Sequence, residues 1–209
     1  MRTHNNLSRV YWIGGSTCAG KTTITNMFSE KYGLKVYHCD EHLGKHIAAS
    51  NIEKYPNLNR ATRLNWDEIL GMSVEEYLKW SIGMFTEEFE MILEDLSELY
   101  GDKPVLVEGV GLFPGLVYDN VPDISRSVWL VAGEVFYKKH QAERKELFER
   151  VKGCSNPAQA LSNYMSFDLA TGRYILNDAK RLGLNVVEIN DDSVLAKTFE
   201  TVSHYLNFE

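Results

Sequence analysis

The sequence predicts an α/β fold in which helices cover both faces of a mostly parallel β-sheet. Two observations predict this fold. Five short apolar runs recur along the 209-residue chain, and their apolar character is mostly continuous, which is typical of strands that are buried on both faces. Segments with apolar residues at helical spacing separate these runs, and such an alternation gives βαβ units with right-handed crossovers.

The predicted strands are rich in Val, Ile, Leu and aromatic residues, and each ends near Gly, Asp, Asn or Glu. They are VYWIGG (10–15), LKVYHC (34–39), PVLVEG (104–109), SVWLVAG (127–133) and NVVEIN (185–190). The predicted helices lie at 21–32, 74–100, 157–182 and 192–207. The connection at 41–103 is much longer than an ordinary crossover, so we expect a mostly helical insertion there. We therefore predict one domain, 1–209, with this insertion and a second variable stretch at 144–160.

The composition argues against several classes of protein. The apolar and charged fractions are those of an ordinary globular chain, and the formal net charge is -7. An acidic chain without a long Lys/Arg run is a poor candidate for general nucleic-acid binding. Cys18, Cys39 and Cys154 form neither a CxxC pair nor a disulfide framework, which predicts a reducing cytoplasm. We find no signal peptide and no apolar run long enough to span a membrane.

A glycine-rich motif stands between the first predicted strand and the first predicted helix. Residues 15–22, GSTCAGKT, fit the pattern GxxxxGK[ST] in the context that this pattern requires. Small residues let backbone N–H groups approach a phosphate chain, and the following helix points its positive end at the same place. The alternative is a plain glycine turn before an ordinary helix, and we interpret Cys18 as a small filler. The predicted nucleotide-binding residues are Gly15, Ser16, Thr17, Cys18, Ala19, Gly20, Lys21, Thr22 and Thr23.

Two residues of the motif carry specific chemistry. The ammonium group of Lys21 is expected to reach the β- and γ-phosphate oxygens of a bound nucleotide, where it acts in catalysis. The hydroxyl group of Thr22 is expected to bind Mg²⁺, which bridges the same phosphates.

Two carboxylates end predicted strands at the edge where ligands of parallel sheets bind. Asp40 closes KVYHCD and Glu108 closes PVLVEG. We predict that Asp40 accepts a proton from an attacking hydroxyl group or holds a metal-bound water. We predict that Glu108 polarises the ligands around Mg²⁺. Thr22, Asp40 and Glu108 are therefore the predicted metal-site residues. The alternative for both acids is a helix cap.

The insertion contains histidines and aromatic residues with more than one interpretation. His42 and His46 are four residues apart, so a helix would place them on one face. They are then a metal-binding pair, substrate contacts or plain surface residues. Trp66, Trp80 and Phe85 either line an acceptor pocket or belong to the core.

Basic residues cluster after the fourth predicted strand, in YKKHQAERKELFERVKG (137–153). We predict that this segment is a lid that closes over the phosphates, excludes water and brings an arginine to the transferred group. Arg144 is the first candidate and Arg150 the second. The alternative is a solvated helix of mixed charge.

These features together resemble the P-loop kinases of small molecules and nucleotides, which include adenylate-kinase-like, nucleoside-kinase-like and shikimate-kinase-like enzymes. The resemblance is carried by GGSTCAGKTT, Asp40, VLVEG, the segment 144–150 and NVVEINDDS. The chain is also similar to uncharacterised bacterial members of this superfamily with the pattern YHCDEH…VLVEGVGLFP. It lacks the arginine-rich monophosphate and lid signatures of true adenylate kinases, which argues against a nucleoside monophosphate acceptor.

The resemblance implies a P-loop NTPase three-layer sandwich with a five-stranded parallel sheet in the order 2-3-1-4-5. It also implies that 41–103 binds the substrate, that 144–160 is the lid, and that ATP and Mg²⁺ are used. The leading hypothesis is an ATP-dependent phosphotransferase that acts on a small-molecule acceptor, such as a nucleoside, nucleotide or hydroxylated metabolite, as a monomer or homodimer.

Two other functions remain open from the sequence. One is an ATPase or nucleotide-dependent switch that acts on a macromolecular partner, and the other is a nucleotide-binding module without turnover. No NKxD or LSGGQ-type motif supports the switch.

Overall fold

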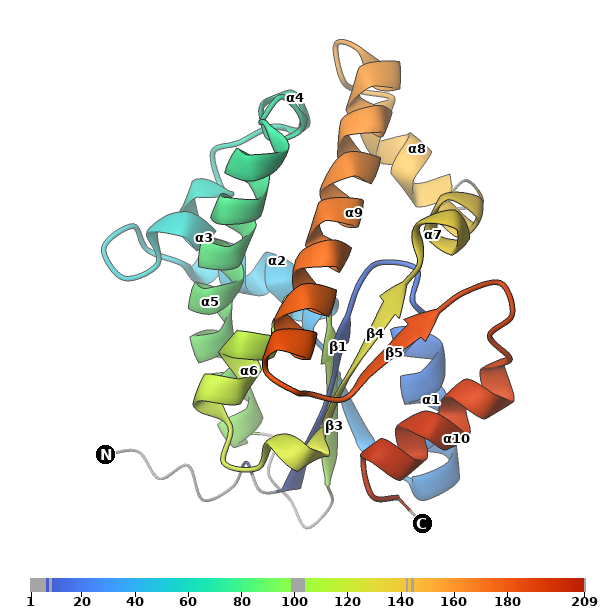
Figure 1. Cartoon of the computed structure of the whole chain (residues 1–209). Helices are drawn as coiled ribbons and strands as arrows, with labels where there is room; N and C mark the ends of the chain where they lie inside the picture. Colours follow the sequence, from blue (N-terminus) through green and yellow to red (C-terminus); the bar gives the residue numbers. More distant parts are fainter. Residues whose placement is uncertain (1–6, 8, 99–103, 142, 144, 209) are drawn as a thin grey trace.

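A five-stranded sheet, parallel throughout, forms the centre of the computed structural model (Figure 1). The structure describes residues 7, 9–98, 104–141, 143 and 145–208. The strands are β1 (Val10–Gly15), β2 (Lys35–His38), β3 (Val105–Gly109), β4 (Ser127–Ala132) and β5 (Val186–Ile189). Their order is β2-β3-β1-β4-β5, which confirms the predicted fold class and strand order.

Helices fill the connections between the strands, and one more helix follows the last strand. They are α1 (Lys21–Tyr32), α2 (Cys39–Ala49), α3 (Pro56–Arg60), α4 (Trp66–Leu70), α5 (Val74–Glu98), α6 (Pro114–Asn120), the 3₁₀ helix η2 (Ile124–Arg126), α7 (Glu134–Gln141), α8 (Lys145–Val151), α9 (Pro157–Arg181) and α10 (Leu195–Tyr205). The four helices predicted from apolar spacing are α1, α5, α9 and α10, with ends that differ by at most a few residues. Among the helices that the structure describes, none combines the length and apolar composition that crossing a bilayer requires.

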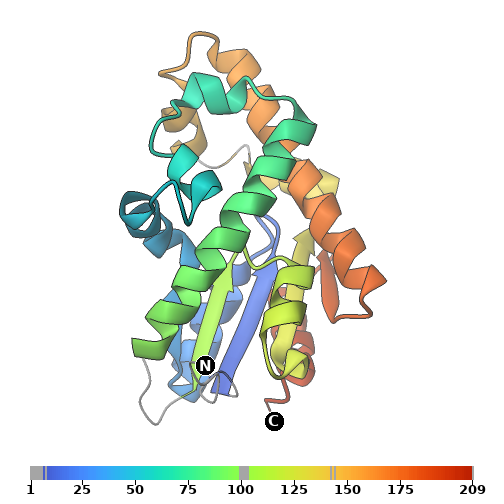
Figure 2. The same ribbon diagram turned by 90° about the vertical axis from the view of Figure 1, so that its left-hand side faces the viewer.

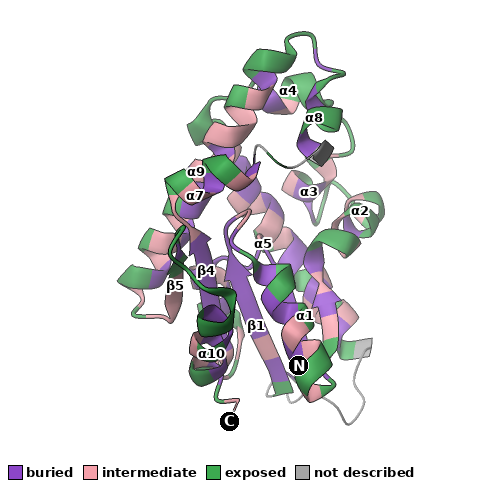
Figure 3. Cartoon of the chain, turned by 90° about the vertical axis from the view of Figure 1, so that its right-hand side faces the viewer, coloured by how far each residue is buried: buried purple, intermediate pink, exposed green. Residues whose placement is uncertain are grey.

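Alternate residues of the central strands supply the cores on the two faces of the sheet. Trp12 and Trp129 pack with residues of α5, α6 and α9 on one face. Ile13 and Leu130, each one residue further along its strand, pack with residues of α1 and α10 on the other face. Because both faces are covered, β1, β3 and β4 are almost wholly buried, as Figure 3 shows for β1 and β4. This burial is the physical reason for their continuous apolar runs.

The long helices α5 and α9 continue beyond the carboxyl edge of the sheet, where smaller helices join them (Figure 2). We call residues 39–70, 74–86, 145–151 and 157–171 the cap. One apolar cluster within it contains Tyr55, Leu58, Trp80 and Met84. A second cluster contains Leu70, Leu147, Val151 and Phe167, so α4, α8 and α9 pack on one another. The cap therefore stands over the edge at which all five strands end, whereas its predicted division into a substrate-binding insertion and a lid stays a prediction.

Candidate active site

The glycine-rich motif forms the turn between β1 and α1. Gly15 has a φ angle of 135°, and a Cβ atom there would overlap the carbonyl oxygen of Leu130 in β4. Gly20 has a φ angle of 79° and is the N-cap of α1. Side chains rarely adopt these left-handed conformations, so both positions require glycine. The two glycines of the motif therefore stand where the backbone has a positive φ angle. Helix α1 begins at Lys21, directly after the second of them.

Hydrogen bonds to neighbouring elements hold this turn in place. The Ser16 N–H group donates to the Leu130 oxygen at 2.9 Å, and the Ser16 hydroxyl oxygen accepts from the Ala132 N–H group at 2.9 Å. The Cys18 thiol contacts Gln141 Oε1 of α7 at 3.0 Å. The backbone of Cys18 itself is left-handed, with a φ angle of 62°. The backbone that is expected to face phosphate is thus fixed to β4 and α7 before any ligand binds.

Lys21 is buried at the centre of this turn, where its Nζ donates to the Ser16 carbonyl oxygen at 2.9 Å. Burial lowers the pKa of Lys21, and the negative charges of Glu108, Asp40 and Asp168 oppose that shift. The ammonium group is therefore held in a place where water solvates it poorly. A polyanion at the turn would offset this cost, which is the electrostatic requirement for a phosphate site.

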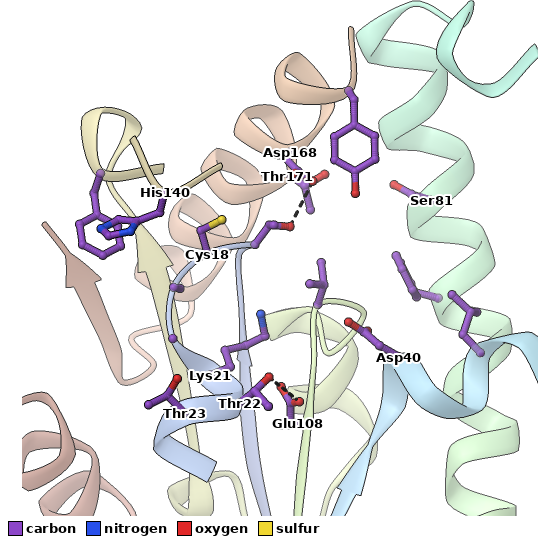
Figure 4. A pocket seen from close by; sticks show the side chains of 18 of the residues that line it. Cys18, Lys21, Thr22, Thr23, Asp40, Ser81, Glu108, His140, Asp168 and Thr171 are labelled. Atoms are coloured by element: carbon purple, nitrogen blue, oxygen red, sulfur yellow. Dashed lines mark hydrogen bonds between the residues drawn. The ribbon is translucent and has the colours of Figure 1, made fainter. Parts of the chain in front are cut away.

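Thr22 and Glu108 meet beside Lys21, as Figure 4 shows. The Thr22 hydroxyl group donates to Glu108 Oε1 at 3.0 Å, and His38 Nδ1 lies 2.8 Å from the same oxygen. The sheet register accounts for this contact, because Glu108 pairs with Ile13 of β1 and with His38 of β2. A hydroxyl and a carboxylate oxygen are the ligand types that Mg²⁺ prefers, so these residues fit the predicted metal site.

Asp40 lies in the first turn of α2 and lines a cavity that the turn with Lys21 and Thr22 also lines. We predicted that Asp40 would close a strand, but β2 ends at His38 and the chain turns into a helix at Cys39. A carboxylate in the first turn is favourable because it faces the positive end of the helix. The side chain is exposed to the cavity and faces it from the opposite side to the turn (Figure 4).

A cavity of about 550 Å³ separates the turn from the cap. Residues 17–23 form one wall, so most of the predicted nucleotide-binding residues face a single space. Cap residues line the rest of the cavity, among them Leu43, Tyr77, Ser81, Phe85, Tyr164, Asp168 and Thr171. A volume of this size is typical of small-molecule sites.

Asp168 of α9 is a central residue that the sequence analysis missed. Its Oδ1 accepts a hydrogen bond from the Thr17 hydroxyl at 3.1 Å, and its Oδ2 accepts one from the Tyr137 hydroxyl at 2.8 Å. Tyr164, Asp168 and Thr171 are spaced four and three residues apart, so they share one face of α9. This spacing is the one signal that the sequence offers, and it equally describes a solvated polar face.

The predicted lid arginines have different outcomes. Arg150 of α8 lines the cavity, is exposed, and places its guanidinium group 5.7 Å from the ring centre of Trp66. Arg144 lies outside the described residues. Of the predicted pocket aromatics, Phe85 lines the cavity, whereas Trp80 is a core residue whose Nε1 donates to the Asn57 carbonyl oxygen at 3.0 Å.

The paired histidines of α2 belong to a buried network rather than to the cavity. His46 Nδ1 lies 3.1 Å from Glu88 Oε1, and His46 Nε2 lies 3.2 Å from Asp95 Oδ2. Burial lowers the pKa of His46, but the hydrogen bonds to these two carboxylates outweigh burial and raise it. His42 also faces Asp95, at 3.5 Å. Within the described ranges, no group of three or more His, Cys, Asp or Glu side chains is placed to hold a metal ion, and His46 is not a surface residue.

No model of a known protein family matches this chain, and no curated protein matches it. Solved structures do match, at low identity. TT1252 from Thermus thermophilus is 13% identical with a TM-score of 0.52, over 95% of this chain and 95% of that one. An uncharacterized protein from Eubacterium ventriosum ATCC 27560 is 14% identical with a TM-score of 0.49, over 96% of this chain and 98% of that one. Shikimate kinase from Acinetobacter baumannii, in complex with shikimate, is 15% identical with a TM-score of 0.43, over 95% of this chain and 93% of that one. The likeness to TT1252 shows that the two chains share a fold.

Proposed function

We propose that this protein is an ATP-dependent phosphotransferase that moves the γ-phosphoryl group of ATP to a hydroxyl group of a small molecule. The observation that carries the proposal is the position of Lys21. Its buried ammonium group lies at the phosphate-binding turn, and across the cavity an exposed carboxylate, Asp40, faces the same space. A cation for the phosphates and a base for the acceptor thus stand on opposite walls of one cavity.

In this proposal the turn binds the triphosphate. Backbone N–H groups of residues 17–22 and the positive end of α1 face the phosphate oxygens, and Lys21 exchanges the Ser16 carbonyl oxygen for the β- and γ-phosphates. Thr22 and Glu108 would hold Mg²⁺, which neutralises negative charge on the phosphates when it is bound. These groups lower the barrier by stabilising the charge on the transferred group.

Asp40 acts on the acceptor. As the acceptor oxygen forms its bond to the γ-phosphorus, the bond from that phosphorus to the β–γ bridging oxygen breaks and ADP leaves. The hydroxyl proton passes to an Asp40 carboxylate oxygen and then to solvent, so the products are ADP, a phosphate monoester and a proton. The cap limits the access of water, which would otherwise take the place of the acceptor. We place this reaction in the reducing cytoplasm, because the three cysteines form no disulfide framework.

Calorimetric titration and an acceptor-dependence assay test this proposal together. We expect Mg·ATP to bind at micromolar to millimolar concentration and ADP release to rise strongly when the correct hydroxyl compound is added. Failure of both Mg·ATP and Mg·GTP to bind at millimolar concentration would remove the phosphate-site argument. An ATP hydrolysis rate that no small molecule changes but that a macromolecule increases would instead favour the nucleotide-dependent switch.

A further inference from the structure

Two side chains hold the carboxylate of Glu108, and one of them has no part in the proposed reaction. The Thr22 hydroxyl group donates to Glu108 Oε1 at 3.0 Å (Figure 4), and His38 Nδ1 lies 2.8 Å from the same oxygen. These partners are 86 and 70 positions away from Glu108 in the sequence. Thr22 and Glu108 are the residues that would hold Mg²⁺, so an inference about His38 rests on the proposed function.

The register of the sheet brings His38 to Glu108. Strand β2 lies at one edge of the sheet and pairs with β3 so that His38 stands opposite Glu108. Paired residues of neighbouring parallel strands point to the same face of the sheet. Ile13 of β1, the other register partner of Glu108, packs against α1, which supplies Thr22. The buried Glu108 is therefore held between an edge strand on one side and α1 on the other.

His38 does not serve as a helix cap, although it occupies the N-cap position of α2. Side chains at this position commonly accept a hydrogen bond from the first helical turn. Among the described residues, the side chain of His38 makes no such bond to α2. Because a carboxylate oxygen only accepts, we assign the hydrogen between the two groups to Nδ1 of His38. The imidazole group is therefore directed at Glu108.

The two contacts have a consequence for metal binding, because both end on one oxygen. The hydrogen bonds that Glu108 accepts from the described residues both go to Oε1. They restrict the rotation of the carboxylate and leave Oε2 for Mg²⁺ or for water bound to it. Thr22 is oriented as well, since a hydroxyl group that donates its hydrogen to Oε1 keeps its lone pairs for a metal ion.

Lys21 is the partner that competes for Glu108. Of the charges that act on the buried ammonium group of Lys21, that of Glu108 has the largest effect. An ion pair between the two would withdraw the cation from the phosphates and the carboxylate from the metal. Instead, Lys21 Nζ donates to the Ser16 carbonyl oxygen at 2.9 Å, while His38 and Thr22 occupy Glu108 Oε1. Donors on the far side of Glu108 thus keep the two opposite charges available for the ligand.

We propose that His38 is a positioning residue for the Mg²⁺ site, which holds Glu108 Oε1 so that the carboxylate and the Thr22 hydroxyl group are oriented before Mg·ATP binds. Groups that orient metal ligands typically change the metal affinity about 10- to 100-fold when they are lost. His38 is not among the described residues that line the cavity, so it acts through Glu108 and is not a catalytic residue.

Two substitutions in the full chain separate the hydrogen bond from the ring. His38→Phe keeps a flat ring and removes the donor, whereas His38→Asn keeps an N–H group at the place of Nδ1. Calorimetry measures the binding of an ATP analogue with an imido β–γ bridge, in EDTA and over a series of Mg²⁺ concentrations. We expect His38→Phe to raise the Mg²⁺ concentration for half-maximal binding about 10- to 100-fold, and His38→Asn to raise it much less. Binding in EDTA should stay the same in both variants.

A spectroscopic readout and a matched control accompany this titration. Mn²⁺ takes the place of Mg²⁺, and electron paramagnetic resonance measures how much Mn²⁺ remains free in the presence of the ATP analogue. The wild type and His38→Asn should bind more Mn²⁺ than His38→Phe. His204→Phe makes the same substitution at an exposed position of α10 and should behave as the wild type.

The outcomes separate this inference from the proposed function. Equal Mg²⁺ dependence in the wild type and His38→Phe would overturn the positioning role, as would equal losses in His38→Phe and His38→Asn. A loss of binding in EDTA as large as the loss in Mg²⁺ would also overturn it, because that result marks a general structural defect. The proposed function survives each of these results. It fails, together with the role of His38, if the wild type binds no nucleotide at millimolar concentration.

Discussion

The glycine-rich turn and the cap line one cavity, yet they are built in different ways. The turn is nine consecutive residues, 15–23, and its shape depends on backbone angles at Gly15 and Gly20 and on hydrogen bonds to β4. The cap consists of segments from 39 to 171 that meet only in the folded chain. Its chemistry lies in side chains such as Asp40, Ser81 and Asp168.

This difference separates two tasks. A backbone cradle recognises a group that is the same in every nucleotide, so its residues need little variety. A wall of side chains recognises whatever the acceptor offers, and each substitution changes it. We therefore expect changes in the turn to affect all turnover and changes in the cap to affect acceptor use, and the following predictions test that division.

The largest effect is expected for Lys21→Ala. Loss of a preorganised positive charge at the transferred group should lower kcat about 10³-fold. The melting temperature should not fall, because burial disfavours the charged form of Lys21 in the folded protein, as its lowered pKa indicates. Steady-state ADP release and thermal unfolding measure the two quantities.

Lys31→Ala is the matched control for this variant, since Lys31 is an exposed residue of the same helix. The control should retain wild-type turnover. Full activity in Lys21→Ala would contradict the role that we assign to the turn.

Asp40→Asn is expected to have the next largest effect. Without a base for the hydroxyl proton, kcat should fall about 10²-fold, whereas the affinity for Mg·ATP should change little. Calorimetry and steady-state kinetics on the same preparation give both values. Glu41→Gln changes the neighbouring exposed carboxylate of α2 and should be nearly silent. An unchanged rate in Asp40→Asn would contradict the role of Asp40 as a base and leave it only the role of a stabilising charge at the N-terminus of α2.

The two walls also differ in how much of them the sequence predicts. The strands can be predicted because burial on both faces requires continuous apolar residues. The turn can be predicted because its backbone angles require glycine at two positions. Glu108 is readable for a related reason, since its strand ends at the edge where the neighbouring β1 also ends. In each case the local sequence contains the cause.

The cap shows why the rest was not predictable. Asp168 meets Thr17 across 151 positions of sequence, and nothing near Asp168 distinguishes it from a solvated acid on a polar helix face. His46 looked like a surface or ligand residue because its partners, Glu88 and Asp95, are supplied by a helix that begins 28 residues later. Such contacts depend on how helices cross, and that geometry is set by packing rather than by local pattern.

A smaller effect, on stability, is expected from the buried network of His46. The groups that face it are Glu88 and Asp95 from α5, with His42, Lys45 and Tyr37 around Asp95. The pKa of His46 is raised above its ordinary value of 6.5, so the stabilisation by its charged form is complete below that pH and is lost as pH rises through the raised value. Ionisation of Glu88, whose pKa burial raises, acts in the same direction.

Thermal unfolding between about pH 6 and pH 9 measures this effect. The melting temperature of the wild type should fall with rising pH, by roughly 2–4 °C for each kcal/mol lost in a chain of this size. The double variant His46→Gln/Glu88→Gln should show a flatter profile, because neither group titrates. His204→Gln, at an exposed position, should keep the wild-type slope. Equal slopes in the wild type and the double variant would mean that the network does not carry a charge.

The smallest effect is expected for Arg150→Ala. Arg150 is exposed and its guanidinium group lies 5.7 Å from the ring centre of Trp66, an arrangement worth only about 0.5–1 kcal/mol at a surface. We expect kcat to fall a few-fold and the KM for ATP to remain unchanged, since α8 belongs to the cap and not to the turn. Trp66→Ala should produce the same small change if the stacked pair positions the guanidinium group over the cavity. A loss in Arg150→Ala as large as that in Lys21→Ala would show that the cap contributes directly to charge stabilisation, and the division of labour between the two walls would then be wrong.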